Sequence, residues 1–245
     1  MKTYPPALPH NPIEKIFEHI YLVTGTSITH HEGTDIQHSS NMTIVRSGEE
    51  LTLINTIRLD DMGLKELDAL GKVKNIVRLG AFHGQDDAFY LGRYDARLWA
   101  LPDMKDDCGR GENINPDVII SAEGEMPFPD CTFFVFETSS YPEAILHLTQ
   151  QGGILISCDS VKNWTSTDRF FSPDTAKEHL AAGEIGSTKI AFWSKACQVT
   201  AADFSRLMLL SFCHLIPAHG QPILNHAHES LSAAIQQFYE NKEPR

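Results

Sequence analysis

The sequence predicts an α/β fold in which two mixed sheets pack face to face under outer helices, a four-layer α/β/β/α sandwich. Short apolar runs bounded by Gly, Ser, Asn or charged residues dominate the first half, and segments with helical spacing follow in both halves. The first runs follow one another through short turns, which favours hairpins over one doubly wound parallel sheet. At 245 residues and 42% hydrophobic content, we expect a single domain over 1–245. Within it, 1–15 should form an N-terminal extension and 225–245 a C-terminal helix.

The first half is expected to begin with strands and to continue with alternating helices and strands. A helix is predicted over 59–70 because apolar residues recur there at helical spacing, and Gly71 should close it. A short helix is predicted over 87–91, where the charge of Asp87 suits a helix N-terminus. The strands are expected at 20–23, 42–45, 51–54, 73–79 and 98–100, with a turn at 47–49.

The second half should open with a polar, glycine-bearing loop over 102–115. Strands are then predicted at 118–121, 132–136 and 145–148. The turn Gly152-Gly153 leads into a strand at 154–158. Helices are expected at 173–182, 200–210 and 229–239, with a last strand at 215–217.

Charge and cysteine usage limit the classes of partner and compartment. The formal net charge of −12, without a local cluster of Lys and Arg, argues against nucleic acid or a membrane surface as partner. No segment approaches the ~20 apolar residues that span a bilayer, and no signal peptide is expected. The cysteines form no Cys-x-x-Cys pair, which favours reduced thiols and a cytoplasmic protein; they are Cys108, Cys131, Cys158, Cys197 and Cys213.

Polar side chains of the kind that bind metals follow three of the predicted strands. His83 and Asp87 follow the strand at 73–79, Asp159 follows the strand at 154–158, and His219 follows the strand at 215–217. Imidazole and carboxylate groups at strand ends are not needed for packing, and a rigid scaffold presents such groups into a shared cleft. These residues are therefore candidates for one chemical site.

In order and spacing, these motifs resemble the metallo-β-lactamase superfamily over roughly 20–219. That family has the motif His-x-His-x-Asp-His, a lone middle histidine, an aspartate after a Gly-Gly-strand and a histidine in a Pro-x-His-Gly turn. Asp159 and His219 match the last two motifs. Asn55, in Leu-Ile-Asn-Thr, stands where the family has an aspartate. The first motif and the middle histidine correspond here to His83, Gln85, Asp87, Ala88 and Ser140.

The resemblance implies a metal site that has lost several ligands. Two imidazoles and two carboxylates remain, and they could hold at most one divalent ion, Zn, Fe or Mn. Gln85 and Ser140 are weaker ligand candidates, and Ala88 offers none. A metal-free site stays open as an alternative. The four ligand candidates are His83, Asp87, Asp159 and His219.

The resemblance also implies a hydrolase-like activity, in which metal-activated water attacks an ester, lactone, amide or phosphoester. Asp87 and Asp159 are the candidate catalytic carboxylates, which would orient the water or accept its proton. The alternative is a non-catalytic member of the fold that binds a small molecule or a partner. The expected ligand is a small molecule of unknown identity, and the oligomeric state is open. By position, Lys162, Asn163 and Trp164 could line the cleft.

Ordinary structural roles compete with these functional readings. Asp87 could be a helix N-cap, Asp159 a turn residue, and Cys158 a small packing residue. His147 and His214 read as core histidines within strands. The remaining histidines considered are assigned to polar loops: His30, His31, His38, His226 and His228.

Overall fold

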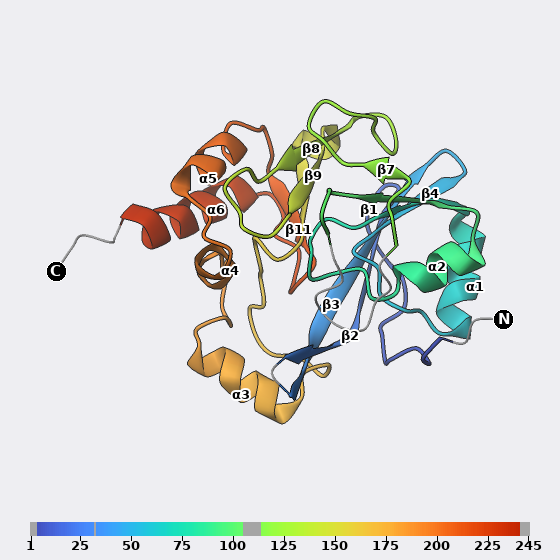
Figure 1. The fold of residues 1–245 in the computed structure, drawn as a ribbon, viewed down its shortest axis with the longest axis horizontal. Coiled ribbons are helices and arrows are strands. Elements are labelled where there is room, and N and C mark those ends of the chain that lie inside the picture. Colours follow the sequence, from blue (N-terminus) through green and yellow to red (C-terminus); the bar gives the residue numbers. More distant parts are fainter. Residues whose placement is uncertain (1–3, 32, 105–113, 241–245) are drawn as a thin grey trace.

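The computed structural model, drawn in Figure 1, describes residues 4–31, 33–104 and 114–240. Its larger sheet contains seven strands in sequence order. Neighbouring strands run antiparallel from β1 to β4 and parallel from β4 to β7. The sheet is therefore mixed, as predicted. The strands are β1 (Glu14–Phe17), β2 (Ile20–His31), β3 (Thr34–Ser47), β4 (Glu50–Ile54), β5 (Lys72–Val77), β6 (Arg97–Ala100) and β7 (Val118–Ile119).

The smaller sheet has the strand order β11-β10-β9-β8. β10 runs parallel to β11 and antiparallel to β9. Because β10 and β11 are parallel neighbours, their carboxyl ends lie at the same edge of the sheet. The strands are β8 (Cys131–Val135), β9 (Ala144–Leu148), β10 (Ile154–Ser157) and β11 (His214–Pro217).

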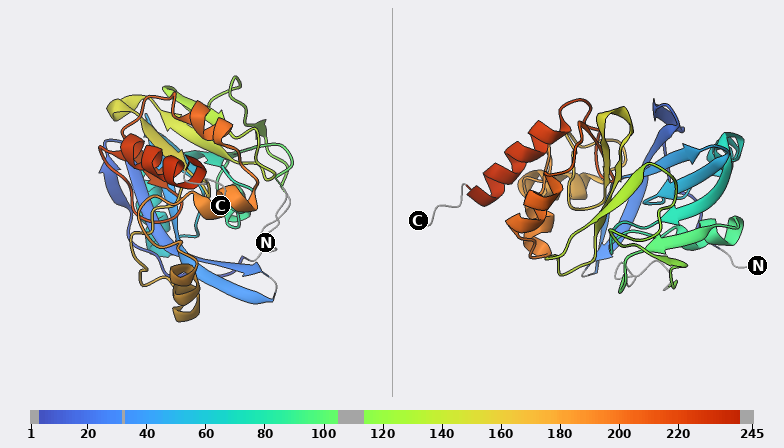
Figure 2. Two further views of the ribbon diagram at one scale, coloured as in Figure 1. Left: turned by 90° about the vertical axis from the view of Figure 1, so that its left-hand side faces the viewer. Right: turned by 90° about the horizontal axis from the view of Figure 1, so that it is seen from above.

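Helices cover the outer face of each sheet, which confirms the predicted four-layer sandwich (Figure 2). Leu64 and Leu67 of α1 and Tyr90 of α2 pack on the larger sheet, whereas Trp193 of α4 and Phe204 of α5 pack on the smaller one. The helices are α1 (Asp61–Leu70), α2 (Asp87–Arg93), α3 (Pro173–Ala181), α4 (Ala191–Ala196), α5 (Ala201–Leu207) and α6 (Ala227–Ile235), with a 3-10 turn η1 (Gln150–Gly152) and a π-helical turn η2 (Gln236–Glu240).

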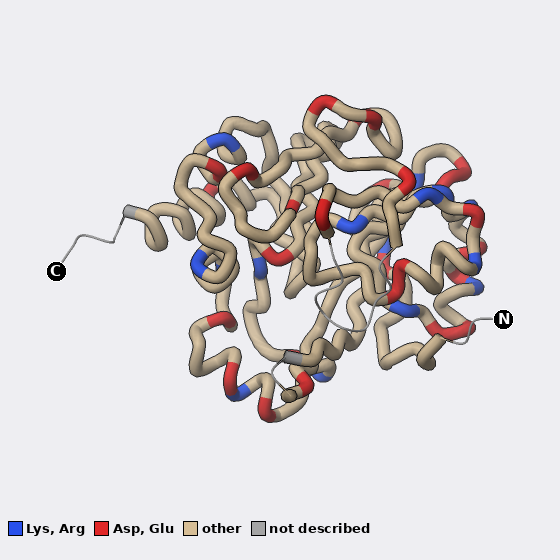
Figure 3. Tube along the Cα trace, in the orientation of Figure 1, with Lys and Arg blue, Asp and Glu red and all other residues tan. Residues whose placement is uncertain are grey.

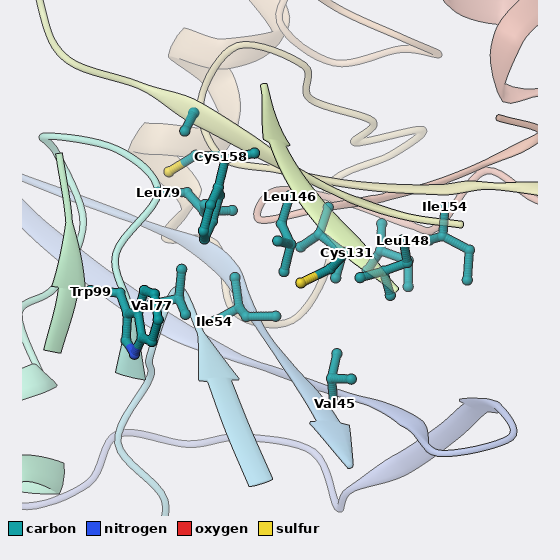
Figure 4. Close-up of a cluster of buried hydrophobic side chains, with 14 of the residues drawn as sticks. Val45, Ile54, Val77, Leu79, Trp99, Cys131, Leu146, Leu148, Ile154 and Cys158 are labelled. Carbon is teal, nitrogen blue, oxygen red and sulfur yellow. The ribbon is translucent and has the colours of Figure 1, made fainter. Parts of the chain in front are cut away.

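The central core lies between the two sheets (Figure 4). Its side chains are almost completely shielded from solvent, and their burial is the main favourable contribution to folding. This core fixes how the two sheets align. From the larger sheet it includes Val45, Ile54, Val77 and Trp99, and from the smaller sheet Leu146, Leu148, Ile154 and Cys158.

Two buried asparagines join the sheets by hydrogen bonds. The amide of Asn55, which follows β4, donates to the Ser157 carbonyl of β10 at 3.1 Å. On β3, the amide of Asn41 donates to the carbonyls of Pro217 and Gly220 at 2.8 and 2.7 Å. Side-chain amides thus satisfy backbone carbonyls at the strand ends where the candidate residues lie.

Several predicted elements have different bounds in the structure. β2 and β3 pair from Ile20↔Val45 out to His31↔Thr34, much further than their apolar runs indicate. The polar outer half is held by ladder hydrogen bonds rather than by core burial, so the hydrophobic pattern does not reveal it. For the same reason the loop assignment of His30, His31 and His38 was wrong, because all lie in these strands.

The sequence pattern also missed two elements. β1 was not predicted, and it overlaps the end of the expected extension over 1–15. α4, which lies between the predicted helices, was also missed because it has only six residues. Of the predicted loop 102–115, residues 105–113 lie outside the described part of the chain.

Charged residues of both signs are interspersed along the trace (Figure 3). Ion pairs such as Arg97 with Glu125, at 2.7 Å, bring opposite charges together on the exposed surface. Among the helices of the described residues, none combines the length and the apolar character that crossing a membrane requires.

Candidate functional site

Three strand-end side chains from both sheets converge on one point. His83 comes from the loop after β5, Asp159 directly follows Cys158 at the end of β10, and His219 follows β11. The Nε2 atoms of His83 and His219 lie 3.1 Å apart. His83 Nε2 is 3.4 Å from Asp159 Oδ2, and His219 Nε2 is 3.2 Å from Asp159 Oδ1. The structure thus brings three of the four predicted ligands together.

The backbone around His219 requires a glycine at the next position. Gly220 has a φ of +95°, and an added Cβ would lie 2.1 Å from the Asn163 carbonyl carbon. The close approach lets the Asn163 amide donate to the His219 carbonyl at 2.8 Å. The Pro-Ala-His-Gly sequence therefore makes a tight contact that aims the imidazole at Asp159.

Asp159 is positioned through its backbone by a buried glutamate. The carboxyl of Glu143 accepts the amide hydrogens of Asp159 and Ser160 at 3.2 and 2.6 Å. Burial raises the pKa of Glu143 well above its usual value, and the neighbouring Asp159 carboxylate adds to this effect. The sequence gives no signal for this role of Glu143, because one glutamate before an apolar strand belongs to no motif.

A single carbonyl oxygen fixes the orientation of two imidazoles. Ser39 O lies 3.1 Å from His38 Nδ1 and 3.3 Å from His219 Nδ1. Because a carbonyl only accepts, both Nδ1 atoms carry hydrogen. When these imidazoles are neutral, each Nε2 atom is therefore a lone-pair atom. The Nε2 lone pair of His219 then faces Asp159 and His83.

Electrostatics place a negative carboxylate beside a neutral imidazole. Burial lowers the pKa of His219 to about 4, although hydrogen bonding to Asp159 opposes the shift. Burial alone would raise the pKa of Asp159, but the Lys162 ammonium and the His83 imidazole hold it well below its usual range. When His219 is neutral with its hydrogen on Nδ1, its Nε2 lone pair lies 3.2 Å from the Asp159 carboxylate in a buried place. A cation between the two atoms would remove their repulsion.

The donor set fits one divalent metal ion. In a tetrahedral zinc site with bonds of about 2.0 Å, neighbouring ligand atoms lie about 3.3 Å apart. The two Nε2 atoms of His83 and His219 lie 3.1 Å apart, and they lie 3.4 and 3.2 Å from the Oδ2 and Oδ1 atoms of Asp159, distances close to this spacing. Imidazole nitrogen and carboxylate oxygen are also ligands that zinc and iron accept. These three residues are the ones that would hold such an ion.

Cys158 adds a sulfur to the same group. Its Sγ and single ligand atoms of His83 and Asp159 all lie within 4.8 Å of one another. The thiol is fully buried, and burial, together with Glu143 and Asp159, raises its pKa well above the usual value. Cys158 was predicted to be a small packing residue, and its side chain does pack in the central core. Its neighbour Asp159 was the only sequence signal of a second role.

Asp87 lies outside this cluster, with both carboxylate oxygens bonded elsewhere. Oδ2 accepts from Arg78 Nε at 2.9 Å, and Oδ1 accepts from the Thr56 hydroxyl at 2.6 Å. Of the weaker candidates, Gln85 lines the cavity beside His83. Ser140 is exposed, and its amide donates to the Cys197 carbonyl at 2.8 Å.

The three residues expected to line the cleft have different positions. Lys162 lines it, and its Nζ is 3.3 Å from Asp159 Oδ1. Asn163 instead bonds to the backbone of neighbouring segments. Its side-chain amide nitrogen donates to Gln221 O at 2.7 Å, and its side-chain oxygen accepts from Thr188 N at 3.0 Å. Trp164 is fully buried, and its indole donates to Ser39 Oγ at 2.9 Å.

The site opens into a cavity of about 650 Å³. Asp159, His83 and His219 lie in its wall together with Lys162, while much of the remaining lining is apolar or aromatic. A cavity of this volume, with a few polar groups in a largely apolar lining, could hold a small molecule.

Comparison with solved structures identifies the fold. The chain superposes on the metallo-β-lactamase FIM-1 from Pseudomonas aeruginosa in the mono-zinc form with a TM-score of 0.60, at 15% identity over 95% of this chain and 97% of that one. For TMB-1 the TM-score is 0.62, at 14% identity over 95% and 99% of the two chains. A metallo-β-lactamase from Hirschia baltica gives 0.55, at 17% identity over 92% and 97%.

This protein therefore has the metallo-β-lactamase fold. No model of a known protein family matches the chain. No curated protein matches it by sequence either. At identities of this size the likeness shows the fold alone, so the chemistry has to be argued from the site.

Proposed function

We propose that this protein is a hydrolase that holds one divalent metal ion with His83, Asp159 and His219. Its substrate would be an ester, lactone, amide or phosphoester that enters the cavity beside these residues. The observation that carries the proposal is the contact of 3.2 Å between His219 Nε2 and the Asp159 carboxylate. With the Nδ1 hydrogen of His219 directed to Ser39, a cation between these two acceptors would hold them together.

Each residue has a distinct task in this scheme. When bound, the metal ion would supply Lewis acidity and lower the pKa of a water ligand to roughly 7. Ser39 orients His219, and the buried Glu143 holds the backbone of Asp159. Asp159 can accept a proton from the attacking water, and the Lys162 ammonium can balance negative charge that develops on the substrate. Asp87 is left out of this set because Arg78 and Thr56 hold both of its oxygens.

The second candidate is a binding protein that needs no metal. It is favoured by the Lys162 ammonium, which lies 3.3 Å from Asp159 Oδ1 and could neutralise this carboxylate by itself. In that case the cavity serves recognition only, and His83 and His219 contact the ligand as hydrogen-bonding groups.

Metal binding separates the two candidates. Purified protein would be stripped with a chelator, supplemented with zinc, iron(II) or manganese, and assayed for bound metal and for hydrolysis of chromogenic esters, lactones and phosphodiesters. The hydrolase predicts one tightly bound ion, and loss of both the ion and the activity in H219A and D159N. No stoichiometric metal in any condition, or activity that survives H219A, would refute it.

Gln85→Ala is the matched control. Gln85 lies in the same loop as His83 and lines the cavity, but it is not one of the three proposed ligands. We expect Q85A to retain one ion per chain, whereas D159N loses it. If Q85A lost the ion while remaining folded by circular dichroism, the assigned ligand set would be wrong.

A further inference from the structure

We propose that the N-terminal segment, residues 4–10, is a specificity wall that restricts the cavity to ligands with an uncharged, apolar chain or ring. Tyr4, Pro5, Pro6 and Leu8 line the cavity together with side chains from other elements, such as Phe192 of α4. Only the position of the ligand's reacting end rests on the proposed hydrolase. The contacts that form the wall involve neither His83 nor His219.

Specific contacts hold the segment against the larger sheet. The Tyr4 hydroxyl donates to the Ala88 carbonyl of α2 at 2.8 Å. Further along, Thr26 N donates to Pro9 O at 2.9 Å, and Asp60 N donates to His10 Nε2 at 2.9 Å. The segment is therefore bonded to α2, to β2 and to the N-terminus of α1. A segment with so many anchors forms a fixed part of the cavity.

Arg58 fastens the beginning of the segment. Its Nη2 donates to the Pro5 carbonyl at 2.9 Å. The guanidinium carbon lies 3.5 Å from the centre of the Phe89 ring and 5.3 Å from that of Tyr4. Cation–π contacts of this kind add to the hydrogen bond. Arg58 therefore contacts both the wall and Asp86, whose Oδ1 lies 3.7 Å from Arg58 Nε.

The charges around the cavity favour an uncharged ligand. Within the described residues, Arg58 is paired with Asp86 and Lys162 with Asp159. A charged ligand chain would have to displace one of these partners or remain unpaired, at a desolvation cost. The lining offers apolar surface instead, from Leu8 on the wall and from Ile28 and Ile36 on the β2–β3 hairpin.

Gly92, beside Tyr4, allows a test that displaces the wall without substituting any residue of the wall or of the site. In α2, a Cβ on Gly92 would lie 2.7 Å from the Tyr4 hydroxyl oxygen, and the three nearest atoms all belong to Tyr4. Gly92→Ala should therefore displace the Tyr4 ring while improving helix propensity. In a Tyr4→Ala background the same substitution has nothing to displace, so G92A should have no further effect.

The readout is equilibrium binding of straight-chain primary amides, from butanamide to decanamide, to chelator-treated protein by calorimetry. For the parent protein we expect affinity to rise roughly fourfold for each buried methylene, until the cavity is filled. Octanoate and octylammonium should bind at least tenfold more weakly than octanamide. In G92A and Y4A the gain per methylene should disappear for the longer amides, and the double variant should match Y4A.

Three results would overturn the proposal. The first is that the affinity of the parent protein does not depend on the chain length of the amide, and the second is that the charged chains bind as tightly as the amides. The third is that folded G92A and Y4A show the same gain in affinity per methylene as the parent protein. Because these amides are measured without metal and without turnover, the outcome is independent of hydrolysis. A protein that binds the series but never hydrolyses a substrate would refute the proposed hydrolase and leave the wall intact.

Discussion

The guanidinium of Arg78 and the carboxylate of Asp87 form an ion pair that is almost entirely buried, with 2.9 Å between Nε and Oδ2. The pair links β5 to the start of α2 and so spans the loop that carries His83. A buried charge without its partner is strongly unfavourable. Both residues thus hold the His83 loop in shape without any metal at Asp87.

Breaking this pair should destabilise the fold without removing a metal ligand. We expect D87N to lower the free energy of unfolding by about 3–5 kcal/mol, because the Arg78 guanidinium would stay buried without a counter-charge. Urea denaturation measures this change. The control is E125Q at the exposed Arg97–Glu125 pair, which should cost less than about 1 kcal/mol. Equal effects of both variants would contradict the importance of burial.

Gly84 is expected to tolerate no side chain. Its φ is +98°, and an added Cβ would lie 2.0 Å from Arg78 Nε. Strain and overpacking together should cost G84A at least about 2 kcal/mol of unfolding free energy. Gly48, with a φ of +63° and open space around it, is the matched control. G48A should show only the backbone cost, about 1 kcal/mol. A G84A variant as stable as G48A would contradict this packing.

Asp86 should lower the stability of the protein as the pH rises. An ordinary salt-bridged carboxylate has the opposite effect. Burial raises its pKa to about 6, although Arg58 opposes the shift. Between the unfolded and folded pKa values the native state binds the extra proton, so stability falls as pH rises through this window. We therefore expect D86N to gain stability relative to the parent protein between pH 4 and pH 7, by at most about 3 kcal/mol.

The measurement is the unfolding free energy of both proteins across this pH range. A difference between them that is constant from pH 4 to pH 7 would show that Asp86 does not titrate with a raised pKa.

Asn55→Asp would place a carboxylate where the amide now donates to the Ser157 carbonyl. The lost donor and the buried charge should cost about 2–3 kcal/mol of unfolding free energy near neutral pH. Asn225, which is exposed and also has a positive φ of 68°, provides the matched control. N225D should stay within about 0.5 kcal/mol of the parent protein. A stable N55D would mean that the cross-sheet hydrogen bond contributes little.

The sequence predicted the parts of the structure that depend on local pattern. Apolar runs located most strands, and strand-end polar residues pointed to His83, Asp159 and His219, which the structure brings together. The pattern could not show that Arg78 turns toward Asp87, because this depends on how β5 leads into the following loop. It also could not place residues 4–10, whose contacts join segments far apart in the chain.

The candidate site is divided between the sheets: His83 belongs to the larger sheet, and Asp159 and His219 belong to the smaller one. A ligand that contacts all three residues connects the two sheets. These sheets must separate when the protein unfolds. Its binding free energy then adds to global stability in full, by RT ln(1 + [L]/Kd), rather than to a local loop. A thermal-shift assay is therefore a sensitive first screen for the natural ligand of this protein. A ligand bound between the two sheets should raise the melting temperature of the whole chain.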